Sequence, residues 1–191
     1  MGDILKLGTI LTLYALTAGA SLALVNIKTA PIIEENRTEA QDMARGRVLP
    51  DMAGGYELTD ADTEFPYWIG YRDAAKTEIG GYIFIAYGPG YSSTIETMVG
   101  VGTDGKIIGS TVLFQLETPG LGAKIEEVRH GEDAPWFTRQ YIGATRADNM
   151  AVTNDGGAID SITGATISSR ALTDSIQLGL ERLHEKTGAG E

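Results

Sequence analysis

The sequence contains no cysteine among its 191 residues. Disulfides, thiolate metal sites and cysteine-ligated iron–sulfur clusters within this chain are therefore excluded. Only two histidines occur, His130 and His184, and neither has a neighbour at metal-ligand spacing, so we expect surface or structural roles for both. The chain has no run rich in Lys and Arg, and its formal net charge is −11. Nucleic-acid binding is therefore not expected. Any redox function needs a bound organic cofactor or a partner subunit.

Residues 7–27 form an uncharged, largely apolar run of 21 residues. As a helix rising about 1.5 Å per residue, this run spans about 30 Å, the thickness of the hydrocarbon core of a bilayer. Its glycine, serine and threonine residues favour a helix that packs against other helices. We expect a retained transmembrane anchor. The alternatives are a signal peptide cleaved near Ala18-Gly19-Ala20 and a buried core helix.

The residues after this run are more polar, and 42% of the whole chain is hydrophobic, which is enough for a folded core. Thr29-Ala30-Pro31 is expected to break the first helix, because proline lacks the N–H group that the helix needs. Alternating charges predict a solvated helix over residues 32–47. With the N-terminus in the cytoplasm, the folded domain lies outside it. The predicted parts are an anchor (residues 1–28), a polar helical connector (residues 29–53) and a domain (residues 54–191).

The middle of the chain is rich in β-branched and aromatic residues and predicts strands over residues 80–87, 94–103 and 106–115. The last two flank Asp104-Gly105, a dipeptide typical of a β-hairpin. Successive strands with short links imply an antiparallel sheet, and a sheet followed by helices makes the fold class α+β. The other expected elements are a short helix over residues 132–141 with Pro135 in its first turn, a last strand over 152–159, a helix over 166–184 and a frayed tail over 186–190.

The most informative motif is Asp-Ser-Ile-Thr-Gly-Ala-Thr at residues 160–166. Small residues precede the expected start of a helix, where backbone N–H groups lack partners and the helix dipole favours an anion. This pattern predicts a phosphate group on or beside Thr166. The alternative is a turn followed by an ordinary N-cap, supplied by Thr163 or Thr166.

A second motif, Glu-Thr-Pro-Gly-Leu-Gly at residues 117–122, directly follows the predicted hairpin. Two glycines and a proline around Leu121 favour a tight loop whose backbone can approach a flat ligand. The alternative is a simple turn leaving the sheet.

Both motifs resemble those of FMN-binding domains. Residues 160–166 match the flavinylation motif Asp-x-x-(Ser/Thr)-Gly-Ala-Thr, in which a transferase esterifies the phosphate of FMN to the last threonine. The chain as a whole resembles the G subunits of the Rnf ion-translocating ferredoxin:NAD oxidoreductases, and also the C subunits of the sodium-translocating NADH:quinone oxidoreductases, which are usually longer. Gln115 stands where the family often has His, and Ser92-Ser93 stands where Gly-Gly is common.

The resemblance implies an electron-transfer subunit that is not catalytic alone, with FMN bound covalently to Thr166, maturation by a flavin transferase, and other membrane subunits as partners. It also implies a single-pass protein of a bacterial or archaeal cytoplasmic membrane with its soluble domain outside. A scaffold domain without cofactor and a stand-alone flavin carrier are the other hypotheses, and Trp136 is a further candidate contact of the flavin ring. The remaining implied cofactor-binding residues are Asp160, Thr163, Gly164, Ala165, Glu117, Thr118, Gly120 and Leu121.

Overall fold

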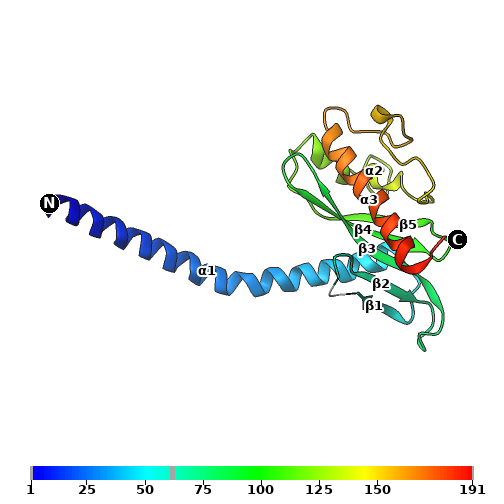
Figure 1. Ribbon diagram of the computed structural model, residues 1–191, viewed down its shortest axis with the longest axis horizontal. Coiled ribbons are helices and arrows are strands. Elements are labelled where there is room, and N and C mark those ends of the chain that lie inside the picture. Colours follow the sequence, from blue (N-terminus) through cyan, green and yellow to red (C-terminus); the bar gives the residue numbers. More distant parts are fainter. Residues whose placement is uncertain (1, 61–62, 191) are drawn as a thin grey trace. The chain divides into compact units, whose positions relative to one another are not determined.

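The computed structural model describes residues 2–60 and 63–190, which divide between two compact units, residues 1–41 and residues 42–191. All described residues of the first unit are helical, and their helix, α1 (Gly2–Val48), runs on into the second unit (Figure 1). Strands and the remaining helices all belong to the second unit. The α+β fold class with an N-terminal apolar helix is therefore confirmed.

α1 is long and apolar enough to cross a membrane, since it contains an 18-residue window of mean hydropathy 1.8 that is not buried in the protein. Its hydroxyl groups are satisfied within the helix: Thr9, Thr12 and Ser21 each donate to the carbonyl four residues earlier, at 2.8–2.9 Å. Such internal bonds suit a helix in lipid, where no water is available to pair with the hydroxyls.

The predicted break at residues 29–31 is wrong, because α1 continues through Pro31. The proline removes only the one hydrogen bond that its own N–H would donate. The residues that follow are rich in Glu, Ala and Arg, which are good helix formers, so the helix resumes at once.

Within residues 2–60 and 63–190, five strands form one antiparallel sheet in the order β1-β2-β3-β4-β5, with each strand next to its neighbour in sequence. The predicted hairpin is confirmed as β4 and β5, and the strand before it as β3. The sequence reading missed β1 and β2, which are only five residues long. The bounds are β1 (Gly55–Thr59), β2 (Tyr67–Tyr71), β3 (Ile79–Pro89), β4 (Thr94–Gly102) and β5 (Ile107–Phe114).

The sheet has a different cover on each face. Helix α3 (Thr166–Thr187) packs on one face against β3 and β4 (Figure 1). There Leu172 and Ile176 join the main apolar core. The last turns of α1 pack on the other face through Ala44 and Val48. Gly100 permits this close approach, because a Cβ there would lie 2.1 Å from the carbonyl oxygen of Val48.

After β5, the structure corrects three further expectations, which concern a helix, a strand and the C-terminal tail. The helix expected over residues 132–141 is only α2 (Trp136–Arg139), with Pro135 at its N-cap position. The strand expected over 152–159 is a single bridge between Val152 and Ile159, because the turn η2 (Thr153–Asp155) and a left-handed Gly156 interrupt it. One more short element, the 3-10 helix η1 (Gly122–Glu126), lies between β5 and α2 in the chain.

The tail is also ordered, contrary to expectation. α3 runs to Thr187 and ends on Gly188 in the left-handed conformation that favours glycine at this position. His184 Nδ1 lies 2.9 Å from the carbonyl oxygen of Ala189, and Ala189 is buried. His184 therefore has the structural role expected from the sequence.

Candidate functional site

The two motifs of residues 117–122 and 160–166 meet at one cavity of about 480 Å³. The loop after β5 forms one wall, the start of α3 forms another, and the β3–β4 loop adds Tyr91. This volume lies in the range of small-molecule sites. The lining residues are Tyr91, Glu117, Thr118, Leu121, Gly122, Gly164, Ala165, Thr166, Ile167 and Ser168.

The N-terminus of α3 reaches the cavity without a side-chain cap. Its N-cap residue is Ala165, and no side chain hydrogen-bonds to the first amides of the helix. Within the described ranges, the N–H groups of residues 166–168 and the hydroxyls of Thr163 and Thr166 have no hydrogen-bond partner. The alternative in which Thr163 or Thr166 is an ordinary N-cap is therefore wrong. Three free amides at the positive end of a helix of 22 residues can bind an anion.

Gly164 makes this arrangement possible. Its φ is +79°, in the region that L side chains rarely adopt, so the turn before the helix favours glycine here. A Cβ at this position would also lie 3.3 Å from Cδ2 of Leu121 on the opposite wall. The glycine of the motif therefore serves both the backbone turn and the width of the cavity.

Glu117 is buried beside the cavity, with 5% of its surface exposed. Its Oε1 accepts hydrogen bonds from the amides of Ser92 and Ser93 at 2.9 and 3.0 Å. Its Oε2 accepts from the amide of Tyr91 at 3.1 Å and from Oγ of Ser168 at 2.5 Å. One carboxylate therefore joins the β3–β4 loop, the loop after β5 and the first turn of α3.

These bonds decide the charge of Glu117. Burial raises the pKa of this carboxyl, but the bonds from Ser168 and from the amides of residues 91–93 lower it, and the net pKa lies below its ordinary value. The group is therefore ionised at neutral pH. Because its oxygens already accept five hydrogen bonds, three from backbone amides and two from the hydroxyls of Ser93 and Ser168, we assign Glu117 to holding the cavity walls rather than to contacting a ligand.

Two glycines leave room for this carboxylate. A Cβ on Gly90 would lie 2.6 Å from Oε1 of Glu117, and a Cβ on Gly122 would lie 2.7 Å from its Oε2. Both distances are shorter than any side chain tolerates without movement of its neighbours. Gly122 of the loop motif and Gly90 of the β3–β4 loop therefore make space for Glu117.

Not every predicted site residue lines the cavity. Thr163 and Gly120 are exposed next to it, and Asp160 lies outside it on the surface. The backbone of Asp160 is fixed by Gln140, through bonds of 2.8 and 3.2 Å. Trp136 lies at a separate surface hollow, where Arg129 stacks over its ring at 3.8 Å. The structure therefore gives no support to Trp136 as a contact of a ring bound in the cavity.

Sequence reasoning missed three lining residues outside the two motifs, and within the second motif it did not name Gly122 as a binding residue. Tyr91 follows a Gly-Pro-Gly segment that signals a loop, but that signal does not say what the loop contacts. Ile167 and Ser168 lie on the exposed and buried sides of the first turn of α3, and no local pattern marks them.

Comparison with known proteins identifies relatives of this chain. Residues 90–181 match the FMN-binding domain family. The chain is 32% identical over 196 residues to the G subunit of the Na⁺-translocating ferredoxin:NAD⁺ oxidoreductase complex of Acetobacterium woodii, covering 93% of this chain and 90% of the relative. It is 31% identical over 195 residues to the G subunit of the ion-translocating oxidoreductase complex of Pseudomonas aeruginosa, covering 93% of this chain and 87% of the relative.

Among solved structures, the chain is similar to the C subunit of the Na⁺-translocating NADH-quinone reductase of Parabacteroides distasonis. The TM-score is 0.47 and the identity 22%, covering 64% of this chain and 62% of that one, less than two thirds of its length. Likeness at this level does not identify a function. The identity and coverage of the two sequence relatives do show the family: the chain belongs to the family of G subunits of ion-translocating oxidoreductase complexes.

Proposed function

We propose that the protein is the electron-transfer subunit of a membrane-bound, ion-translocating ferredoxin:NAD⁺ oxidoreductase complex, and that it carries FMN joined through its phosphate to Thr166. The observation that carries this proposal is the uncapped start of α3. There a free threonine hydroxyl and three free amides lie together at the cavity. An anion bound by these amides sits beside the hydroxyl of Thr166.

The cavity suits both ends of an FMN molecule. The amides of residues 166–168 can hold the phosphate, and no Lys, Arg or His is among the lining residues. Leu121 and Ile167, which are 43% and 50% exposed, and Tyr91, which is 73% exposed, offer apolar and aromatic surface for a flat ring. Bound FMN supplies one- and two-electron transfer, and the protein contributes position and electrostatics.

Attachment to Thr166 is a group transfer from FAD. The Oγ atom of Thr166 forms a bond to the phosphorus of the FMN half, the bond from that phosphorus to the oxygen shared with AMP breaks, and AMP leaves. The hydroxyl proton passes to a base. A threonine hydroxyl is a poor nucleophile unaided, and the carboxylate in the cavity wall, that of Glu117, already accepts hydrogen bonds on both oxygens. We therefore assign the base to a separate flavin transferase, which Asp160 on the surface would help to recognise.

A covalent link matters because of where the domain lies. We propose that α1 anchors the chain in the cytoplasmic membrane and that the domain from residue 54 onward faces the extracytoplasmic side, where a dissociated cofactor would be lost. The internally bonded hydroxyls and small residues of α1 support packing against other membrane subunits. These subunits would supply and receive the electrons.

The proposal is tested by asking whether flavin is bound covalently to Thr166. When the protein is produced together with a flavin transferase, the SDS-denatured band should fluoresce as flavin, and its intact mass should rise by FMN less one water. Thr166→Ala should abolish both signals, whereas Thr153→Ala, at an exposed threonine outside the cavity, should leave them unchanged. Flavin fluorescence that persists in Thr166→Ala refutes the attachment site. Wild-type protein without added mass supports the alternative of a scaffold domain.

A further inference from the structure

We propose that Ser169 and the ion pair between Asp155 and Arg170 are positioning residues for the attachment reaction. They fix the turn of residues 162–165 and the segment before it through contacts outside the cavity lining, so that Thr166 and the amides after it remain open to the phosphate. This inference rests on the proposed function, and it assigns roles to residues outside the flavinylation motif.

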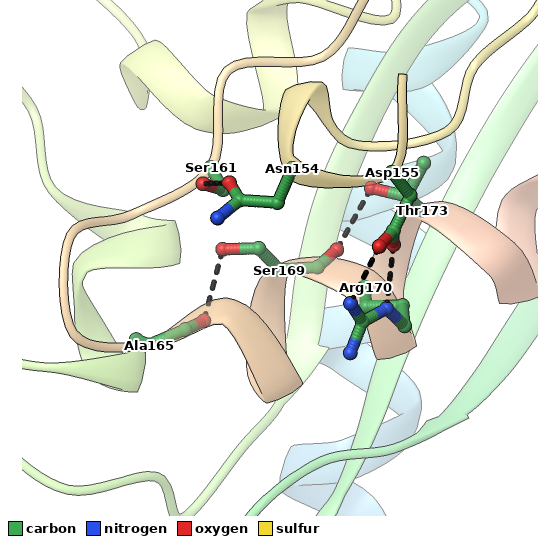
Figure 2. Close-up of polar contacts among 7 residues, drawn as sticks. All are labelled: Asn154, Asp155, Ser161, Ala165, Ser169, Arg170 and Thr173. Carbon is green, nitrogen blue, oxygen red and sulfur yellow. Dashed lines mark hydrogen bonds and ion pairs between the residues drawn. The ribbon is translucent and has the colours of Figure 1, made fainter. Parts of the chain in front are cut away.

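Ser169 joins the two ends of the turn with one hydroxyl group. Its side chain is fully buried, and its Oγ accepts from the amide of Ile162 at 3.0 Å. The same Oγ donates to the carbonyl oxygen of Ala165 at 3.0 Å (Figure 2). The turn is closed as well by the amide of Ala165, which donates to the carbonyl of Ile162 at 2.9 Å. The chain from 162 to 165 is thus fixed at both ends.

The place of Ser169 explains why the start of the helix stays free. In an ordinary N-cap, a side chain before the helix bonds to the second or third amide of the helix and occupies it. Here the residue that fixes the turn lies one turn inside the helix and bonds backward. The amides of residues 166–168 therefore keep their capacity for an anion.

The ion pair fixes the segment that leads into the motif. Arg170 donates from Nε and a terminal nitrogen to the two carboxylate oxygens of Asp155, at 2.6 and 2.7 Å (Figure 2). Next to it, Ser161 donates to Oδ1 of Asn154 at 2.5 Å. A bidentate pair restricts orientation as well as distance. The segment from 154 to 161 is thereby tied to α3 through residues that do not line the cavity.

The first turn of α3 is in turn fixed to the core. Thr173 donates to the carbonyl oxygen of Ser169 at 2.7 Å, and its Oγ1 lies 2.9 Å from the hydroxyl of the fully buried Tyr141. Ser169 therefore has a rigid support. A group transfer needs the attacking oxygen in one direction relative to the phosphorus, so a support of this kind affects the rate of the chemical step.

The experiment measures attachment kinetics with full-length protein in detergent, a flavin transferase and FAD. Initial rates over a range of acceptor concentrations separate kcat from KM. We expect Ser169→Ala to lower kcat by about tenfold or more, with a KM change of less than about threefold, because the motif that the transferase recognises is intact. We expect a smaller loss of kcat in Asp155→Asn. Given enough time, both variants should still reach complete attachment, whereas a misfolded fraction would lower the final extent.

Matched controls come from the same helix. Ser175→Ala removes a hydroxyl that donates to the carbonyl of Leu172 at 2.9 Å, away from the turn. Lys186→Gln removes the ion pair with Asp60 at the other end of α3. Both should keep wild-type kcat. If Ser169→Ala unfolds, Asp155→Asn carries the test, since its pair is at the surface.

Hydrogen exchange of the flavin-free protein gives an independent readout. The amides of Ile162 and Ala165 should exchange faster in Ser169→Ala than in wild type, and at the wild-type rate in Ser175→Ala. Unchanged kcat in Ser169→Ala and Asp155→Asn overturns this inference and leaves Thr166 as the attachment site. Wild-type protein that takes up no flavin on Thr166 overturns the proposed function instead.

Discussion

Replacing Glu117 by Gln tests whether this buried carboxylate holds the cavity together. Its Oε1 accepts hydrogen bonds from the amides of Ser92 and Ser93 and a long one from the hydroxyl of Ser93. Its Oε2 accepts from the amide of Tyr91 and the hydroxyl of Ser168. The NH₂ group of glutamine must replace one of the oxygens, and in either orientation it faces at least one backbone N–H that cannot turn away. The substitution therefore leaves a buried donor unpaired and weakens the remaining bonds by removing the charge.

The size of the effect follows from these bonds. A hydrogen bond to a charged group contributes about 1.5–3 kcal/mol, and a buried donor without a partner costs about 1–3 kcal/mol. We expect Glu117→Gln to lower the free energy of unfolding by about 3 kcal/mol, which for a chain of this length lowers Tm by about 6–12 °C. Both tryptophans, Trp68 and Trp136, lie in the domain, so their fluorescence reports its unfolding.

The control is Glu126→Gln, an exposed carboxylate that accepts one hydrogen bond from Gln115. Its Tm should stay near that of wild type. The pH dependence of the stability difference between wild type and Glu117→Gln is a second test, and its direction follows from the pKa of Glu117. Because the folded pKa of Glu117 lies below its ordinary value of 4.5, its contribution is complete above that pH and is lost as the pH falls further. The difference between wild type and Glu117→Gln should therefore shrink in acid. Equal stability of the two proteins at neutral pH would refute the reasoning.

Two further substitutions test the walls of the site. Gly122→Ala places a Cβ 2.5 Å from Oγ of Ser168 and 2.7 Å from Oε2 of Glu117, so it should cost about 1–3 kcal/mol and reduce covalent flavin content, as measured by Tm and in-gel fluorescence. A flavin content and Tm equal to wild type would contradict the tight contact. Tyr141→Phe removes the bond to Thr173 and should cost about 1 kcal/mol, because the hydroxyl of Thr173 keeps its donation to the helix backbone. A loss several times larger, measured by thermal unfolding, would show that the network is not organised in this way.

Much of the fold could be predicted because it depends on local patterns. The apolar run predicts a long helix, Asp104-Gly105 predicts the hairpin, and the periodic residues after 166 predict the last helix. Other expectations failed where local signals compete. The short strands β1 and β2 carry little sequence signal, and Pro31 stands in a stretch of strong helix formers that continues the helix. The strand expected over residues 152–159 contains a glycine pair, and the structure has a turn there.

The sequence by itself determined that residues 160–166 lead into a helix, because small residues and the helical period are local properties. It also determined the charge, the absence of thiols and the apolar length of α1. Only the tertiary structure decided what Glu117 does, since its partners lie 24–26 residues earlier and 51 residues later in the chain. The same holds for Ser169. Its hydroxyl fixes the turn before α3 without bonding to the first amides of the helix, as an N-cap side chain would, and so leaves those amides free. Such roles depend on which backbone groups remain unpaired after folding, and no local pattern records that.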